Sequence, residues 1–135
     1  MLTNFSPLYT VNSKIAIGDA GVKGNGIFAL QNIRANELIE RVPVLVIPSA
    51  LDYQILQVEI GNYIFEWSNN DMAIALGFGS IYNHSYSPNA YYELIYEKNS
   101  IEFIALSDIL PGEEIVINYN GKPDDKSKLW FKVLP

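Results

Sequence analysis

The chain has 135 residues, the length of one domain and enough for a hydrophobic core of its own. It contains no cysteine and one histidine, so disulfides, thiolate metal sites and histidine-rich metal sites are excluded. Nine basic and fifteen acidic side chains give a formal net charge of −6. This charge argues against direct binding to nucleic acid and suits a basic partner, such as a lysine-rich peptide.

The first residues, MLTNFSPLYTVNSK, contain neither the basic nor the apolar segment of a signal peptide. No apolar stretch approaches the roughly 20 residues needed to span a bilayer. We therefore expect a soluble, cytoplasmic protein with no membrane partner, and leave a nuclear location open.

Short apolar runs broken by Gly, Pro and Asn predict a mainly β fold with many turns. Ile15 and Ile17 alternate with small residues, as in a strand. Residues 37–41 and 44–47 are predicted as two strands separated at Pro43, because proline is confined to edges and bends of a sheet.

One short helix is predicted after these strands. Leu51, Ile55 and Val58 recur at helical spacing between Ser49, a candidate N-cap, and Gly61, a candidate stop. The alternation of apolar and polar residues then predicts a strand over residues 63–67.

The second half contains a predicted hairpin, in which residues 91–96 and 101–106 flank a four-residue connection. Pro111 and Gly112 fit the central positions of a type II turn, with glycine supplying the positive φ. A strand over residues 115–119 is expected to follow the turn.

Several residue groups could carry chemistry, and each also has a purely structural interpretation. Gly24 and Gly26 could let backbone amides approach a ligand, or could simply form a turn between strands. The amide of Asn83 could hold both ends of an amino-acid-like ligand, or Asn83 and His84 could satisfy backbone groups in a buried loop. Tyr119 could face a pocket or lie in the core.

Two further groups are ambiguous in the same way. Glu113 and Glu114 could form a carboxylate pair, although their place beside the Pro-Gly turn favours solvated side chains. Seven of the nine tyrosines lie between residues 53 and 96. They could reflect β propensity alone or line a slot for a cation.

The order of three motifs is more specific than any one of them. The motifs are KGNGIFA at 23–29, NHSYSPN at 83–89 and GEEIVINY at 112–119. In this order and spacing the chain resembles the SET-domain protein lysine methyltransferases, most closely the minimal, stand-alone SET domains of viruses and microbes. The resemblance implies a mainly β, β-clip fold, one short helix, and a C-terminal pseudoknot that brings Asn83 and Tyr119 together.

The resemblance also implies a division of the chain. Residues 1–135 would form a single SET domain with a core at about 13–120. Residues 48–72 would be a variable insert, and residues 121–135 a tail that completes the site.

The resemblance implies that S-adenosylmethionine is the cofactor and that the side-chain amine of a protein lysine is the substrate. Tyr119 would be the catalytic tyrosine, and Tyr92 and Tyr63 would be walls of the lysine channel. The implied cofactor-binding residues are Gly24, Asn25, Gly26, Phe28, Asn83, His84, Tyr119, Trp130 and Phe131.

The chain departs from the family pattern in lacking cysteine. Many members bind zinc through cysteines after the last motif, whereas no metal site is expected here. Trp130 and Phe131 would instead pack on the adenine or over the lysine slot, or the tail would plug the core. The implied partner is a basic protein or peptide, histone-like or other, and a homodimer is left open. The alternative is an inactive SET fold that binds a cationic peptide in an aromatic slot.

Overall fold

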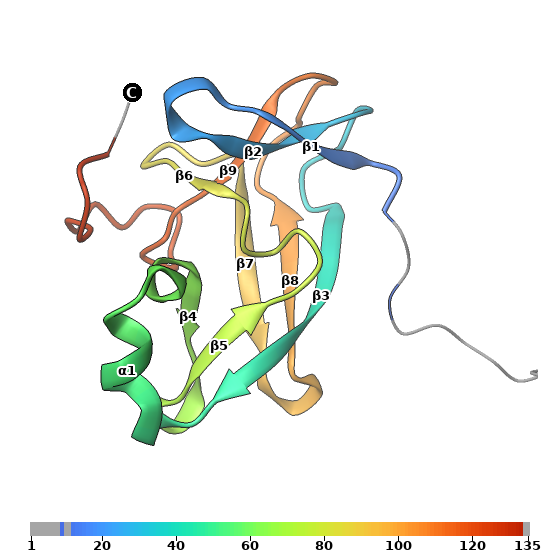
Figure 1. Ribbon diagram of the computed structural model, residues 1–135. Coiled ribbons are helices and arrows are strands. Elements are labelled where there is room, and N and C mark those ends of the chain that lie inside the picture. The colour runs from blue at the N-terminus through green and yellow to red at the C-terminus, as the bar shows by residue number, and fades with distance from the viewer. Residues whose placement is uncertain (1–8, 10–11, 134–135) are drawn as a thin grey trace, which may run out of the picture.

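The computed structural model describes residue 9 and residues 12–133 (Figure 1). Residues 1–8, 10, 11, 134 and 135, where the expectations about the N-terminal segment and the end of the tail fall, lie outside the described residues. The described part contains these strands: β1 Ile15–Asp19, β2 Asn25–Ala29, β3 Leu38–Ile47, β4 Ile64–Glu66, β5 Met72–Ala75, β6 Asn83–His84, β7 Ala90–Ile95, β8 Ser100–Ala105 and β9 Glu114–Ile117. Its α-helix, α1, spans Asp52–Leu56, so the prediction of a mainly β fold with one short helix is confirmed.

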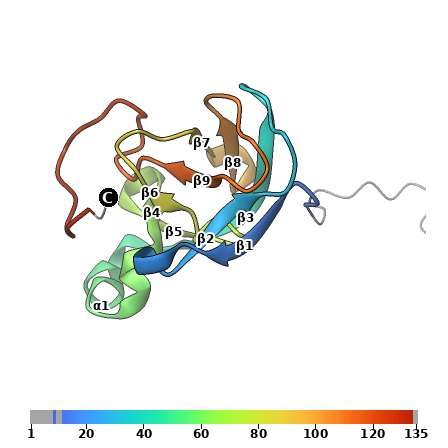
Figure 2. The same cartoon turned by 90° about the horizontal axis from the view of Figure 1, so that it is seen from above.

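The strands form two sheets, with the orders β1-β2-β9-β6 and β4-β5-β3-β8-β7. In the first sheet the C-terminal strand β9 lies between β2 and β6, antiparallel to β2 and parallel to β6 (Figure 2). The end of the chain therefore enters between two strands that precede it by tens of residues. This strand order agrees with the C-terminal pseudoknot that the resemblance implies.

Alternation along the strands gives the four-stranded sheet two different faces. Ile15, Ile27, Ile115 and Ile117 are buried on one face and form part of the core. On the other face, Phe28 is in register with Glu114, and Asn83 with Val116. Residues from the glycine turn, β6 and β9 thus meet on the face opposite the core.

The prediction of two strands around Pro43 is wrong, because β3 runs unbroken through this residue. Pro43 instead marks the point where β3 changes partner. Pro43 is in register with Ser100 of β8, and Val44 with Ala75 of β5. Proline is tolerated there because the ladder changes sides at that point.

The predicted helix is shorter than expected. Two 3-10 turns, Ser49–Leu51 and Glu59–Tyr63, flank α1. Ser49 is not an N-cap, since Leu51 holds that position and no side chain caps the helix. Gly61 does not end α1, because it lies within the second 3-10 turn.

The hairpin strands agree with the predictions to within one residue, whereas β9 ends at Ile117, two residues before the predicted end at residue 119. The hairpin of β7 and β8 is confirmed, with Asn99 in the left-handed region at its turn. Gly112 has a φ of +85°, as the type II turn requires.

A buried carboxylate joins the two sheets. Glu40 of β3 accepts a hydrogen bond from the Tyr82 hydroxyl at 2.9 Å and another from the Phe78 backbone N–H at 3.1 Å. Burial raises the pKa of Glu40, and the two hydrogen bonds oppose this rise. The Tyr82 ring stacks on Phe103 of β8, with 4.3 Å between ring centroids. Tyr82 directly precedes β6, so this pair anchors the start of that strand.

We expect Tyr82→Phe to lower the free energy of unfolding by about 1.5–3 kcal/mol, because the buried Glu40 carboxylate loses a hydrogen bond. The same change should raise the pKa of Glu40 further. A carboxyl group whose pKa is raised on folding stabilises the protein below its unfolded pKa, and this contribution is lost as the pH rises through the folded pKa. In the variant, where the pKa of folded Glu40 is higher, the decline of this stabilising contribution should therefore continue to higher pH. Denaturant unfolding across a pH series measures both effects.

Tyr96→Phe is the matched control, since this tyrosine is 47% exposed. Equal stability of the two variants at neutral pH would contradict the role given to the Glu40–Tyr82 hydrogen bond.

Candidate functional site

The turn between β1 and β2 depends on two glycines for different reasons. Gly24 has a φ of +81° and a ψ of −133°, a conformation open to glycine, while a Cβ there would meet nothing within 4 Å. Gly26 lies in ordinary strand conformation, but a Cβ there would lie 2.5 Å from Glu114 Oε2 and 2.9 Å from Asn83 Nδ2. Gly24 is therefore required by the backbone and Gly26 by the side chains packed against it.

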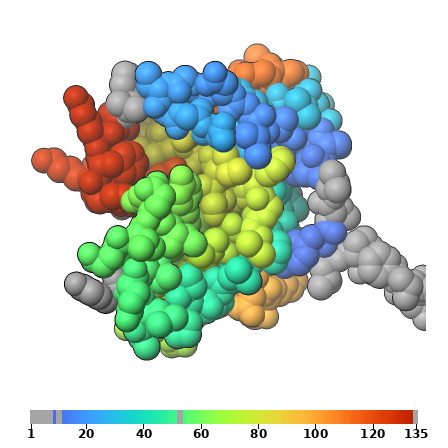
Figure 3. Space-filling view, in the orientation of Figure 1, coloured from blue at the N-terminus to red at the C-terminus, as the bar shows by residue number. Residues whose placement is uncertain are grey.

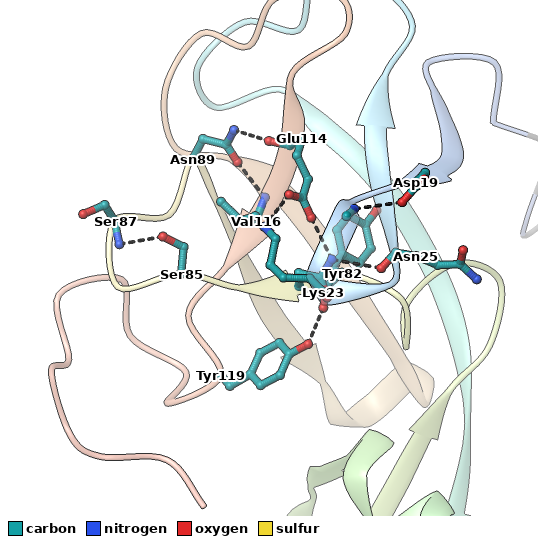
Figure 4. Close-up of polar contacts among 12 residues, drawn as sticks. Asp19, Lys23, Asn25, Tyr82, Ser85, Ser87, Asn89, Glu114, Val116 and Tyr119 are labelled. Carbon is teal, nitrogen blue, oxygen red and sulfur yellow. Dashed lines mark hydrogen bonds and ion pairs between the residues drawn. The ribbon is translucent and has the colours of Figure 1, made fainter. Parts of the chain in front are cut away.

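A polar cluster lies beside Gly26. Figure 4 labels three of its members, Lys23, Asn25 and Glu114. Asn83 Nδ2 donates to the backbone oxygen of Asn25 at 2.9 Å and to Glu114 Oε2 at 2.7 Å. Glu114 Oε1 lies 2.5 Å from Lys23 Nζ. The glycine turn, β6 and β9 are thus joined through polar side chains on the face of the sheet opposite the core.

His84, the neighbour of Asn83, faces the other way. Its Nδ1 accepts a hydrogen bond from the Tyr119 backbone N–H at 3.0 Å, so the ring hydrogen of a neutral imidazole is on Nε2. Burial lowers the pKa of His84, which keeps the ring neutral near pH 7. Its ring lies edge-on to Tyr86, Tyr119 and Phe131. The side chain positions the Tyr119 backbone and packs against aromatic rings.

Tyr119 follows β9 and reaches back to β6. Its hydroxyl donates to the backbone oxygen of Tyr82 at 2.6 Å, as Figure 4 shows. Burial, with smaller effects from Tyr63 and Glu114, raises the pKa of Tyr119 to about 12. The phenol is therefore protonated at neutral pH, and its hydrogen is committed to the Tyr82 carbonyl.

Tyr119 also lines a cavity of about 570 Å³. The cavity is bounded by the insert, by the segment before β6 and by the C-terminal tail. Figure 3 shows the insert (green) and the tail (red) approaching each other on this face. The lining residues are Leu56, Gly61, Asn62, Tyr63, Ile64, Phe65, Glu66, Gly79, Ser80, Tyr82, Ile117, Tyr119, Asn120, Lys128, Leu129 and Trp130.

The tail places two aromatic residues at the site. Trp130 lines the cavity and stacks on Tyr119, with 6.3 Å between ring centroids and 18° between planes. Its indole N–H donates to Asn62 of the insert at 3.3 Å. Phe131 lies edge-on to His84 and Trp130. Because Trp130 is 63% exposed, it does not plug the core.

Of the two tyrosines predicted as walls of the lysine channel, only one lines the cavity. Tyr63 lines the cavity that Tyr119 also lines. Tyr92 is not among the lining residues, and its ring packs edge-on against Phe65, which does line the cavity. Burial and the nearby Glu66 raise the pKa of Tyr92 to about 12. Phe28 lies on the same face as Glu114, with its ring over Gly18.

The roles of Lys23 and Glu114 are not apparent from the sequence motifs. Glu114 was expected to be solvated, but its side chain is only 16% exposed and is bonded to both Lys23 and Asn83. Alternation along β9 could have found it, since Ile115 and Ile117 point into the core and Glu114 must then lie on the opposite face. Glu66, Lys128 and Tyr82 of the cavity carried no comparable signal.

Two findings bear on metals and membranes. Within residues 12–133 no three His, Asp or Glu side chains gather in a group that could hold a metal ion. No helix in the described part of the chain is long and apolar enough to cross a membrane.

Comparison with known proteins adds independent evidence. The family model described as SET domain matches residues 24–120. A Schizosaccharomyces pombe histone-lysine N-methyltransferase specific for H3 lysine-37 is 35% identical over 123 residues, which cover 90% of this chain and 80% of that protein. Homo sapiens histone-lysine N-methyltransferase 2B is 31% identical over 126 residues, 85% of this chain but 5% of that protein.

A solved structure of another protein is similar to this chain in both fold and sequence. A Plasmodium falciparum protein, described as a candidate histone methyltransferase, is 32% identical and superposes with a TM-score of 0.61. The match covers 81% of this chain and 99% of that one. With the SET model over residues 24–120 and the Schizosaccharomyces pombe relative at 35% identity, the chain belongs to the SET-domain family of protein-lysine methyltransferases.

Proposed function

We propose that the chain transfers a methyl group from S-adenosylmethionine to a lysine side chain of a basic protein, such as a histone. One observation carries the proposal: two neighbouring residues of β6 serve two different sites. Asn83 faces the cluster at the glycine turn, whereas His84 and the carbonyl of Tyr82 hold Tyr119 at the cavity. A cofactor on one side and a lysine on the other could meet across this strand.

The residues at the glycine turn fit the cofactor's amino-acid end. The space beside Gly26 admits polar side chains because no Cβ occupies it. Asn83 is only partly buried, and among the described residues no hydrogen bond reaches its Oδ1. Gly24, Gly26 and Asn83 would hold the methionine end. When bound, S-adenosylmethionine supplies a methyl group on a positively charged sulfur.

The cavity fits a lysine side chain. Tyr63, Tyr119 and Trp130 offer aromatic faces, which attract ammonium groups. Glu66 adds a carboxylate to the lining, and the net charge of −6 favours approach of a basic protein. The relatives named as histone-lysine methyltransferases support a histone or similar substrate.

The substrate amine must lose a proton before it can attack. With a usual pKa of about 10.4, only a few lysines in ten thousand are neutral at pH 7. Desolvation in the cavity disfavours the ammonium form and lowers the lysine pKa. Tyr119, protonated at neutral pH, is not the base. Its hydrogen points to the Tyr82 carbonyl, so its oxygen lone pairs are available to orient the amine and the methyl group.

Contacts of the Tyr119 oxygen with the amine and the methyl group are individually weak. A C–H···O contact contributes about 0.5–1 kcal/mol, so most of the acceleration comes from holding the two reactants in line. The alternative, an inactive module that binds a cationic peptide, needs only the aromatic cavity. It gives no reason for the polar cluster at Gly26.

We expect Tyr119→Phe to lower kcat and kcat/KM together by more than tenfold, because the lost oxygen acts mainly during methyl transfer. Cofactor affinity should change less than twofold, and the free energy of unfolding by about 1 kcal/mol. Methylation of core histones with labelled S-adenosylmethionine measures the rate, and calorimetry measures affinity.

Tyr91→Phe is the control, since this tyrosine lies on β7 and does not line the cavity. A wild-type rate in folded Tyr119→Phe would remove Tyr119 from the mechanism. A wild-type protein that binds basic peptides and methylates no lysine would favour the inactive module.

We expect Asn83→Ala to weaken binding of S-adenosylhomocysteine at least tenfold, because a charged group of the ligand loses a hydrogen bond. Calorimetry should also show one site per chain. Replacement of Asn62, which contacts Trp130 at the cavity, by Ala should leave this affinity near wild type. Equal affinities of Asn83→Ala and the wild type would remove Asn83 from the site.

A further inference from the structure

The side-chain amide of Asn83 has no donor left to offer a ligand. One hydrogen of Nδ2 is directed to the Asn25 backbone oxygen at 2.9 Å and the other to Glu114 Oε2 at 2.7 Å. Exchanging the amide nitrogen and oxygen would place three oxygens against one another, so the hydrogen bonds determine the orientation. Only Oδ1 remains, and an amide oxygen can only accept a hydrogen bond.

The Glu114 carboxylate is itself held in place. Lys23 Nζ lies 2.5 Å from its second oxygen, and the two side chains are 24% and 16% exposed. Partial exclusion of water strengthens an interaction between opposite charges. Glu114 Oε2 lies 2.5 Å from the position that a Cβ of residue 26 would take, so it uses space that only a glycine leaves open. Glu114 is therefore confined by an ion pair with Lys23 and by a hydrogen bond with Asn83.

We propose that Glu114, held by Lys23, is a positioning residue that orients Asn83 so that Oδ1 accepts a hydrogen bond from the α-ammonium group of the cofactor. This inference rests on the proposed function and gives Asn83 a narrower role than its side chain allows. An amide that was free to turn could bind either the ammonium or the carboxylate of an amino acid. In this arrangement Asn83 binds the ammonium alone, and the carboxylate must find its donors elsewhere.

The first test needs no ligand. The side-chain amide resonances of Asn83, identified by their loss in Asn83→Ala, report on the two hydrogen bonds of Nδ2. In Glu114→Ala these resonances should move strongly, and in Glu114→Gln less, since the glutamine oxygen can still accept. Glu113→Gln is the matched control, because it removes the same charge from the adjacent, exposed position. Its Asn83 resonances should match those of the wild type.

The second test compares two ligands by calorimetry. S-adenosylhomocysteine carries the amino-acid end, whereas 5′-methylthioadenosine has the same nucleoside without it. Glu114→Ala should weaken the first about tenfold and leave the second unchanged, because a misdirected amide loses a charge-assisted hydrogen bond. Glu114→Gln should lie between Glu114→Ala and the wild type. Glu113→Gln should bind both ligands as the wild type does.

The outcomes separate this inference from the proposed function. Unmoved Asn83 resonances in Glu114→Ala, or equal weakening of both ligands, would overturn the positioning role. Tighter binding of S-adenosylhomocysteine by Glu114→Ala would overturn it too, by showing that the carboxylate obstructs the site. If the wild type binds neither ligand, the proposed function and the ammonium assignment fall together, while the resonances still decide whether Glu114 orients Asn83. Thermal unfolding of each variant confirms that it is folded.

Discussion

The parallel pairing of β9 with β6 is the constraint on which the site depends. Only two residue pairs form it, Asn83 with Val116 and His84 with Ile117. On its other side β9 pairs with β2, which carries Gly26 and Phe28. Three segments that are far apart in the sequence become neighbours through this one strand, and Tyr119 follows it by two residues.

The two residues of β6 also explain how one short strand separates two sites. Side chains alternate along a strand, so Asn83 and His84 must point to opposite faces. Each then makes a polar contact that would be costly to leave unmade: Asn83 with Glu114, and His84 with the Tyr119 backbone. The Glu40–Tyr82 hydrogen bond holds the residue just before them. Polar groups, rather than apolar packing alone, fix the position of this strand.

Much of the fold could be predicted from the sequence where the signal was local. The β7–β8 hairpin and the turn at Gly112 follow from residues next to one another. The resemblance carried by the three ordered motifs predicted the fold, but Tyr119 contacts Tyr82 and His84, while Asn83 faces the glycine turn. The errors arose where distant segments decide the outcome. Pro43 breaks no strand, because β3 exchanges β8 for β5 there. Ser49 does not cap α1, because Ser49 is itself the first residue of a 3-10 turn that precedes the helix.

Among the site residues, too, local motifs could be recognised in the sequence, whereas contacts between distant segments could not. The glycine turn was recognised as a motif, but the need for Gly26 comes from Glu114, which lies 88 positions later and was expected to be solvated. Tyr63 lies on the cavity because the insert faces the segment before β6 and the tail across it, whereas Tyr92 packs against Phe65 and does not line the cavity. No spacing within the chain distinguishes these two tyrosines, because the contact between Phe65 of β4 and Tyr92 of β7 joins residues that are distant in the sequence.

The central position of β9 also has a consequence for synthesis of the chain. Proteins are made from the N-terminus, so β1, β2 and β6 are synthesised before β9. Until then Asn83 has no hydrogen bond to Glu114, and His84 has none from the Tyr119 backbone. Tyr119 is also absent from the cavity lining. A nascent chain that ends before residue 119 therefore has no assembled site, and the ability to modify other proteins arises only when the last strand closes the sheet.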